Sequence, residues 1–121
     1  MAVSTKLLGR WGEAKAAEML KRKGYRIIAM GYRTRFGELD IIAQKKNMVV
    51  FVEVKLRKND RFAKAMEYVD RNKQERLKAT ARLWMSERGE EVSCRFDVVE
   101  IYAPEGMNTE VPVINHIENA F

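Results

Sequence analysis

The segment Met48–Leu56 limits the possible folds more than any other part of the chain. Its even-numbered positions are all apolar. Its odd-numbered positions begin apolar, with Val49 and Phe51, and then become charged, with Glu53 and Lys55. Because side chains alternate between the two faces of a β-strand, the segment presents apolar side chains on both faces. Such a strand is normally central in a covered sheet, where Glu53 and Lys55 are costly unless they are paired.

The rest of the sequence supplies elements that can form and cover such a sheet. Periodic apolar positions, capping residues and turn signals predict two helices and four further strands. These elements are the helices Thr5–Lys23 and Asp70–Arg88, and the strands Tyr25–Met30, Glu38–Gln44, Arg95–Tyr102 and Val111–Ile117. The chain of 121 residues is expected to form one domain, residues 1–121, with the order α-β-β-β-α-β-β.

Connection lengths indicate how the strands pair. Only Lys45-Lys46-Asn47 separates Glu38–Gln44 from the central strand, so these two strands are predicted to form an antiparallel hairpin. The second helix crosses between the third and fourth strands, which predicts that those two are parallel. Pro112 places the last strand at an edge, because proline cannot donate to a ladder. A mixed sheet flanked by helices is therefore expected.

The composition excludes several classes of protein. Hydrophobic residues make up 46% and charged residues 33%, which is globular composition. The apolar run Met48–Val52 is far shorter than a membrane helix requires, and no signal peptide is readable at the N-terminus. Cys94 is the only cysteine, so an internal disulfide framework is excluded. These features predict a cytoplasmic protein without a membrane partner.

The charge distribution favours a polyanionic partner. Residues 1–88 carry 22 Lys and Arg against 10 Asp and Glu, whereas residues 89–121 carry one Arg against seven acids. The net charge of +6 therefore combines a basic body of +12 with an acidic end of −6. A basic body of this kind is typical of nucleic-acid-binding proteins, but a merely soluble charged surface is the alternative.

The hairpin register predicts a cluster of charges. If Lys46-Asn47 is a two-residue loop, Asp40 lies opposite Glu53, and Glu38 lies opposite Lys55, on one face. Directly opposed Cβ atoms are about 4.5–5.5 Å apart, so the Asp40 and Glu53 carboxylates would repel each other. A one-residue slip would send Asp40 to the other face.

Two interpretations of this cluster remain open at the sequence level. Asp40, Glu53 and Lys55 sum to −1, and Glu13 on the first helix would make −2, which a divalent cation neutralises. Hard oxygen ligands with few protein donors suit Mg²⁺ or Mn²⁺ better than zinc. The alternative is a structural ion-pair network in which Lys55 bridges the two carboxylates.

The same residues carry a resemblance to known families. The runs Gly37–Ala43 and Val50–Lys55 resemble the D…E-x-K core of the PD-(D/E)xK restriction-endonuclease-like superfamily. The whole chain is more closely similar to the YraN-like family of uncharacterised bacterial proteins, which are predicted nucleases. That similarity includes Gly9, Gly12-Glu13, Leu20, Gly24-Tyr25, Asn72-Lys73-Gln74, Ala81–Trp84, Cys94–Val99 and Ile117–Phe121. One departure is Gly31, which stands where the family usually has Asn.

The resemblance implies a restriction-endonuclease-like fold and metal-dependent phosphodiester hydrolysis. Asp40 and Glu53, with a backbone carbonyl near Val54, would hold Mg²⁺ or Mn²⁺. Lys55 would orient or help deprotonate the attacking water, and Glu13 would be a further metal ligand. A possible homodimer is also implied, because junction-resolving relatives make two symmetric cuts.

Basic residues near this core are the expected contacts to nucleic acid, with DNA favoured over RNA. These residues are Arg57, Lys58, Arg61 and Lys64 after the central strand, and Lys73 at the start of the second helix. A lysine that merely covers the sheet edge is the alternative for Lys73. For the whole chain, the alternatives to a nuclease are a nucleic-acid-binding module that keeps the fold without cutting, and a small basic scaffold protein.

Overall fold

A computed structural model describes residues 5–58, 69–89 and 91–121. Its elements follow in the order α1 (Thr5–Arg22), β1 (Arg26–Thr34), β2 (Gly37–Lys45), β3 (Met48–Arg57), α2 (Arg71–Arg88), β4 (Ser93–Tyr102) and β5 (Val113–Ile117), with a short 3₁₀ helix at Gly106–Asn108. Arg61 and Lys64, two of the expected nucleic-acid contacts, lie outside the described residues. In the described part of the chain, neither α1 nor α2 is long and apolar enough to cross a membrane.

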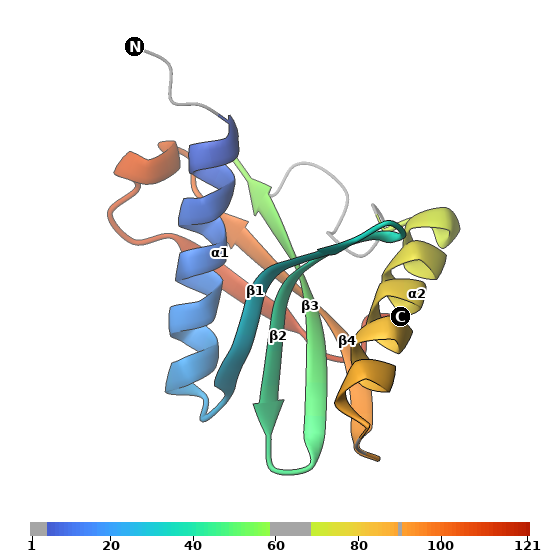
Figure 1. Cartoon of the computed structure of the whole chain (residues 1–121). Coiled ribbons are helices and arrows are strands. Elements are labelled where there is room, and N and C mark those ends of the chain that lie inside the picture. Colours follow the sequence, from blue (N-terminus) through green and yellow to red (C-terminus); the bar gives the residue numbers. More distant parts are fainter. Residues whose placement is uncertain (1–4, 59–68, 90) are drawn as a thin grey trace.

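The strands form one five-stranded mixed sheet in the order β1-β2-β3-β4-β5. The central strand β3 is parallel to β4, and the other neighbours pair antiparallel. Figure 1 shows α1 on one side of the sheet and α2 on the other. The mixed α/β architecture, the parallel pair and the edge position of β5 predicted from the sequence are confirmed.

The central strand is buried on both faces, as its composition predicts. Val50 and Val52 pack in the cluster that contains the α1 residue Leu20. Val49 and Phe51 point the other way and pack in the cluster that contains the α2 residues Leu77 and Trp84. Phe51 meets Trp84 edge to face, with ring centroids 5.8 Å apart. Glu53 therefore lies on the α2 side of the sheet, next in line after Phe51.

The β2–β3 hairpin has the predicted register over its first half. The two-residue turn Lys46-Asn47 is followed by the pair Lys45↔Met48, and the ladder continues to Ile41↔Val52. Beyond that pair the strands separate, because β1 and β2 continue together as a ribbon that bends toward the N-terminal end of α2 (Figure 1). The expected direct opposition of Asp40 with Glu53 is thus replaced by a different arrangement, described below.

The first strand is longer than its sequence pattern suggests. The sequence predicts a strand over Tyr25–Met30, but β1 runs from Arg26 to Thr34 with Gly31 inside it. The backbone of Gly31 has φ +65°, in the left-handed region that Gly and Asn adopt most readily. This conformation gives a physical reason why Gly can replace the Asn that the family usually carries there. The last strand is shorter than expected and begins after Pro112.

We predict that Gly31→Asn changes stability little, whereas Gly31→Ala destabilises the protein by about 1–2 kcal/mol, the cost of a left-handed residue with an ordinary side chain. Space is not the obstacle, because an added Cβ would lie 3.6 Å from Glu38 Oε1, an ordinary contact. Urea unfolding of the two variants measures the difference. Equal stabilities for Asn and Ala at this position would contradict the conformational explanation.

Candidate active site

Asp40 lies where β2 and β3 separate. It falls between the ladder pairs Met30↔Ile41 and Tyr32↔Leu39 with β1. Its Oδ2 accepts a hydrogen bond of 2.8 Å from the backbone N–H of Val54, so the carboxylate bridges the gap between the diverging strands.

The surroundings of Asp40 disfavour its charge. Burial raises its pKa to about 7, helped by the neighbouring charges of Glu53 and Glu13, while the Val54 N–H and Lys73 act in the opposite direction. A carboxyl group that is half-protonated near neutral pH lacks a sufficient cation beside it.

Glu53 gathers the basic side chains of the site. The residue is only 7% exposed, and its Oε1 lies 3.3 Å from Lys55 Nζ on the same strand. The same oxygen makes a short hydrogen-bonded ion pair with Lys73 Nζ from α2. Lys73 is in the first turn of that helix, which Asp70 caps by accepting a 2.8 Å hydrogen bond from the Lys73 N–H. The helix cap therefore fixes the residue that reaches across to the sheet.

The two lysines differ in how tightly they hold a proton. Burial lowers the pKa of Lys55, and its contact with the Lys73 ammonium lowers it further, against the pull of Glu53. Burial also lowers the pKa of Lys73, but hydrogen bonds with Glu53 and Lys55 outweigh it and leave that pKa raised. Lys55 is thus the more acidic of the two ammonium groups.

The first helix brings Glu13 toward this cluster. Its neighbour Gly12 is buried, and a Cβ there would lie 3.5 Å from Leu56 Cδ1, so the helix passes close to β3. Burial raises the pKa of Glu13, and the charges of Glu38 and Glu53 raise it further. Glu38 itself does not oppose Lys55 as the extended register predicted. It pairs with Arg33 on β1, at 3.2 Å, because β2 has left β3 by this point.

The oxygen ligands of Asp40 and Glu53 suit a divalent cation, but Lys73 competes with it for Glu53. Asp40 and Glu53 offer hard oxygen ligands, and Mg²⁺ commonly uses one or two carboxylates together with waters and substrate phosphate. Among the described residues, no group of three or more His, Cys, Asp or Glu side chains forms a candidate metal site, and the expectation that Glu13 is a further ligand stays a prediction. Lys73 is a cation that the sequence-based count of −1 did not include. With it, the formal charges of the two carboxylates and the two lysines sum to zero.

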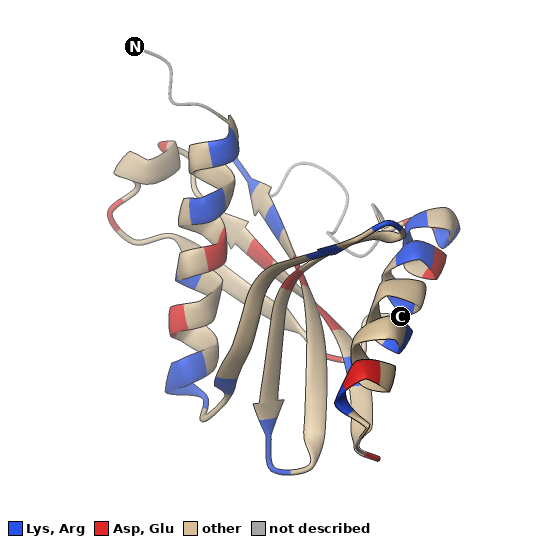
Figure 2. Ribbon diagram, in the orientation of Figure 1, with Lys and Arg blue, Asp and Glu red and all other residues tan. Residues whose placement is uncertain are grey.

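An open cleft of about 540 Å³ gives access to these carboxylates. Asp40, Glu53 and Lys73 line this cleft. Its other lining residues include Arg33, Arg35, Phe36 and Arg76. A second cleft of about 620 Å³ lies toward α1 and shares Arg33 and Glu38 with the first. In Figure 2, basic positions mark the tip of the β1–β2 ribbon and the start of α2 around this region.

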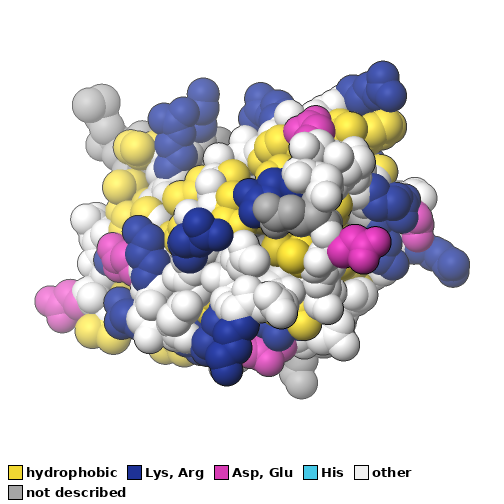
Figure 3. Space-filling model, turned by 60° about the horizontal axis from the view of Figure 1, so that its bottom comes forward, with side chains coloured by type: hydrophobic (Ala, Val, Ile, Leu, Met, Phe, Trp, Pro, Cys, Tyr) yellow, Lys and Arg dark blue, Asp and Glu magenta, His cyan; other side chains and the backbone are white. Residues whose placement is uncertain are grey.

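Positive charge is not confined to the cleft. Figure 3 shows Lys and Arg side chains spread over the face that carries the β2–β3 turn and the C-terminal end of α1. Lys45, Lys46 and Lys21 are among the exposed residues there. The basic character of the chain therefore cannot by itself locate a binding surface, and the cleft is distinguished by its carboxylates.

The described residues among the expected nucleic-acid contacts differ in their exposure and in their partners. Arg57 is partly buried at the end of β3, where its carbonyl accepts a 2.7 Å hydrogen bond from the Ala103 N–H. Lys58 is exposed directly after β3. Lys73 is part of the ion pair with Glu53. Sequence reasoning missed the cleft residues of the β1–β2 tip, which the strand formers Tyr32 and Thr34 after Gly31 could have indicated.

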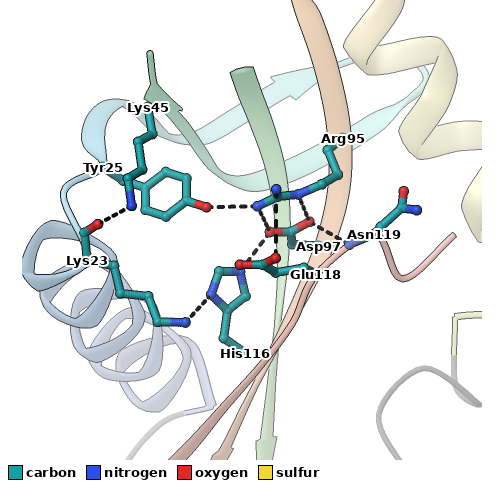
Figure 4. Close-up of polar contacts among 8 residues, drawn as sticks. All are labelled: Lys23, Tyr25, Lys45, Arg95, Asp97, His116, Glu118 and Asn119. Atoms are coloured by element: carbon teal, nitrogen blue, oxygen red, sulfur yellow. Dashed lines mark hydrogen bonds and ion pairs between the residues drawn. The ribbon is translucent and has the colours of Figure 1, made fainter. Parts of the chain in front are cut away.

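A second buried polar cluster lies on the α1 side of the sheet, the face opposite to Glu53 (Figure 4). Asp97 is fully buried and accepts hydrogen bonds from two Arg95 nitrogens, both at 2.8 Å, and from the Asn119 N–H at 2.9 Å. Its Oδ2 also lies 2.7 Å from His116 Nε2, and His116 Nδ1 lies 2.9 Å from Lys23 Nζ. Despite burial, which raises it, the pKa of Asp97 is lowered by the hydrogen bonds from His116, Arg95 and Asn119. With its acceptor capacity filled, Asp97 is a structural clamp on the C-terminal segment.

Comparison with known proteins identifies relatives along the full chain. Residues 12–101 match the model of the uncharacterised protein family UPF0102, a range that contains Asp40, Glu53, Lys55 and Lys73. A UPF0102 protein of Caldicellulosiruptor saccharolyticus is 43% identical over 115 residues, covering 94% of this chain and 96% of the relative. UPF0102 protein TTE1452 of Caldanaerobacter subterraneus subsp. tengcongensis is 40% identical over 121 residues, covering 98% of each. UPF0102 protein mlr4633 of Mesorhizobium japonicum is 43% identical over 115 residues, covering 93% of this chain and 85% of the relative.

We predict that Asp40→Asn and Asp97→Asn change stability in opposite directions. The raised Asp40 pKa means that the folded state holds its proton while the unfolded state loses it, so its stability cost grows as the pH rises from about 4 to 7. Asp40→Asn should therefore stabilise the metal-free protein at pH 8, by up to roughly 4 kcal/mol, and lose that gain near pH 4.

For Asp97 the sign is reversed. Its lowered pKa gives stability that is present above the ordinary value of 3.8 and lost as the pH falls through the folded value. Asp97→Asn should destabilise by about 3–5 kcal/mol at pH 7, and less at very low pH. Denaturant unfolding of both variants across pH 3–8 tests the pair. A strongly destabilised Asp40→Asn would show that Asp40 belongs to a structural ion-pair network instead.

Proposed function

The chain belongs to the uncharacterised protein family UPF0102, and we propose that it is a Mg²⁺-dependent nuclease of the restriction-endonuclease-like class that hydrolyses phosphodiester bonds in nucleic acid. Membership confirms the YraN-like resemblance of the sequence. The observation that carries the proposal is the meeting of Asp40 and Glu53, on diverging strands, in an open cleft beside two lysines. DNA is the proposed substrate class.

Asp40 and Glu53, with the backbone carbonyl of Val54, are the proposed holders of Mg²⁺. When bound, the ion would act as a Lewis acid on the phosphate and activate the attacking water. Burial raises the pKa of Asp40, and the neighbouring charge of Glu53 raises it further, so a bound divalent cation would favour the charged form of this carboxyl. Mg²⁺ and substrate phosphate are expected to bind together, because the protein offers few ligands of its own.

Lys55 is the proposed partner of the attacking water. Its lowered pKa and its position beside Glu53 allow its amine to accept a hydrogen bond or a proton at lower pH than an ordinary lysine. Lys73 and the arginines of the cleft would neutralise the charge of the substrate backbone. Lys73 contacts one oxygen of Glu53, Oε1, so its ammonium group would compete with a cation for that oxygen and could instead contact the substrate phosphate.

One observation favours the alternative, a nucleic-acid-binding module that does not cut. Lys55 and Lys73 already neutralise Glu53, so the cluster is a complete ion-pair network without a metal. In that case the basic cleft would bind the backbone, and the carboxylates would only position the lysines. Binding without metal-dependent cleavage distinguishes this function.

We predict metal-dependent cleavage of labelled nucleic acid that depends on Asp40. A panel of single-stranded, duplex and branched DNAs and RNAs is incubated with Mn²⁺ or Mg²⁺, and the products are separated on denaturing gels. Asp40→Ala and Lys55→Ala should each reduce the rate by about 100-fold or more, by loss of a metal ligand or a proton acceptor. Glu18→Ala, which removes an exposed carboxylate on α1, is the matched control and should leave the rate unchanged. Binding of the panel without cleavage by the wild type would favour the non-cutting module.

We also predict that Mn²⁺ stabilises the folded protein. At ten times the dissociation constant the stabilisation is about 1.4 kcal/mol, which corresponds to a rise in melting temperature on the order of 3–8 °C. Asp40→Asn should lose most of this response. Lys73→Met should respond at lower Mn²⁺ concentration than the wild type, because its ammonium no longer competes for Glu53. An unchanged melting temperature in both the wild type and Lys73→Met would contradict the metal site.

A further inference from the structure

The tip of the β1–β2 ribbon presents an aromatic ring to solvent beside the cleft. Thr34 and Gly37 form the last ladder pair, and Arg35-Phe36 make the turn between them. Phe36 is 37% exposed, and the Arg35 guanidinium lies 4.9 Å from the centre of its ring. An exposed phenylalanine that directly follows Arg35, with Arg33 two positions before that arginine, is an unusual use of a turn, where polar and flexible residues normally lead.

This tip is held firmly in place. The Phe36 N–H donates to Thr34 Oγ1 at 3.1 Å, which closes the turn. The same hydroxyl lies 3.4 Å from Thr80 Oγ1 of α2, and Thr80 is fully buried and donates to the Arg76 carbonyl at 2.9 Å. The ribbon is therefore attached to the helix that also carries Lys73. Such attachment reduces the ordering cost when a ligand binds.

The tip and the carboxylates share one cleft. Phe36 and Arg35 line the same cleft as Asp40 and Glu53. A polyanion that places a phosphate at the carboxylates would pass beside the arginines and bring its adjacent bases to the tip. The positive charge of the tip favours such a ligand over an apolar peptide, because Arg33 is already paired with Glu38 but the Arg35 guanidinium lies over the Phe36 ring, where a phosphate can approach it.

We propose that Phe36 is a stacking site for an unpaired nucleobase, with Arg35 on the ring and Arg33 beside it neutralising the flanking phosphates. The inference rests on the proposed function, and it narrows the substrate to nucleic acid with a single-stranded segment next to the cleaved bond. A base inside a duplex is stacked on both faces and offers no free face to Phe36. Recognition of this kind tolerates any sequence, because every base has a π-face.

Binding to a matched pair of oligonucleotides tests this site without cleavage. One fluorescein-labelled 12-mer of deoxythymidine is compared with a 12-mer of equal charge in which all bases are missing, in EDTA, by fluorescence anisotropy. The wild type should bind the base-containing strand more tightly. Phe36→Ala and Phe36→Leu should lower that affinity by about five- to 100-fold and leave the abasic strand unaffected, since stacking acts only on bases. Phe36→Tyr, which keeps a planar ring, should retain the preference.

Two controls make the result specific. Val113→Ala removes apolar surface from an exposed residue on β5, 64% exposed, and should change neither affinity. Melting temperatures of the Phe36 variants should stay within about 2 °C of the wild type, because the ring is at the surface. Arg35→Ala should weaken both strands and reduce the salt dependence by about one phosphate contact.

The outcomes separate this inference from the nuclease proposal. Equal binding of the two strands by the wild type, or a Phe36→Ala variant that keeps the preference, would overturn the stacking site even if the protein cuts DNA. Base-dependent binding through Phe36 without cleavage would support the stacking site and leave only the catalytic proposal contradicted. Failure to bind either strand at low salt would overturn the stacking site, whereas the nuclease proposal is decided by the cleavage panel with metal present.

Discussion

The hydrogen bond from the Val54 N–H to Asp40 replaces a backbone contact at the point where β2 leaves β3. A central strand cannot leave a buried N–H without a partner, and the carboxylate satisfies it after the ladder has stopped. This contact releases the β1–β2 ribbon, which can then bend to α2 and attach there through Thr34 and Thr80. It also brings a carboxylate to Glu53 on the neighbouring strand. The Asp40 side chain therefore satisfies the backbone at the point where the sheet opens, while the contact of the ribbon with α2 sets the direction of the opening.

Two buried aspartates differ in the hydrogen-bond donors that surround their carboxylates. Asp97 is surrounded by Arg95, His116 and a backbone N–H, and these donors lower its pKa. Asp40 has one N–H donor, a second carboxylate nearby and a pKa raised to about 7. The first carboxylate is fully satisfied and clamps the chain end. The second is disfavoured in its charged form by burial and by the neighbouring Glu53, although it lines an open cleft.

The sequence predicted the parts of the site that depend on local periodicity. The two-residue turn after Lys45 fixed the register to Ile41↔Val52, and alternation placed Glu53 and Lys55 on one face. It did not predict the splaying of the strands, because that depends on where the β1–β2 ribbon finds a packing partner. The strand predicted over Tyr25–Met30 was too short, because Gly31 with its left-handed backbone is accommodated within β1. The prediction that Glu38 lies opposite Lys55 was wrong because the strands diverge, and Glu38 pairs with Arg33 instead.

By itself the sequence determined the mixed α/β class, the order of the elements and the burial of β3, because apolar periodicity and connection lengths act over short distances along the chain. The tertiary structure decided which charges meet. Lys73 reaches Glu53 across 20 positions of sequence because α2 begins over the end of the sheet, and this contact changes the charge balance of the site. The exposed Phe36 is a candidate binding residue only because it lines the same cleft as Asp40 and Glu53. Electrostatic energies and clefts depend on distances in space, and sequence spacing does not contain those distances.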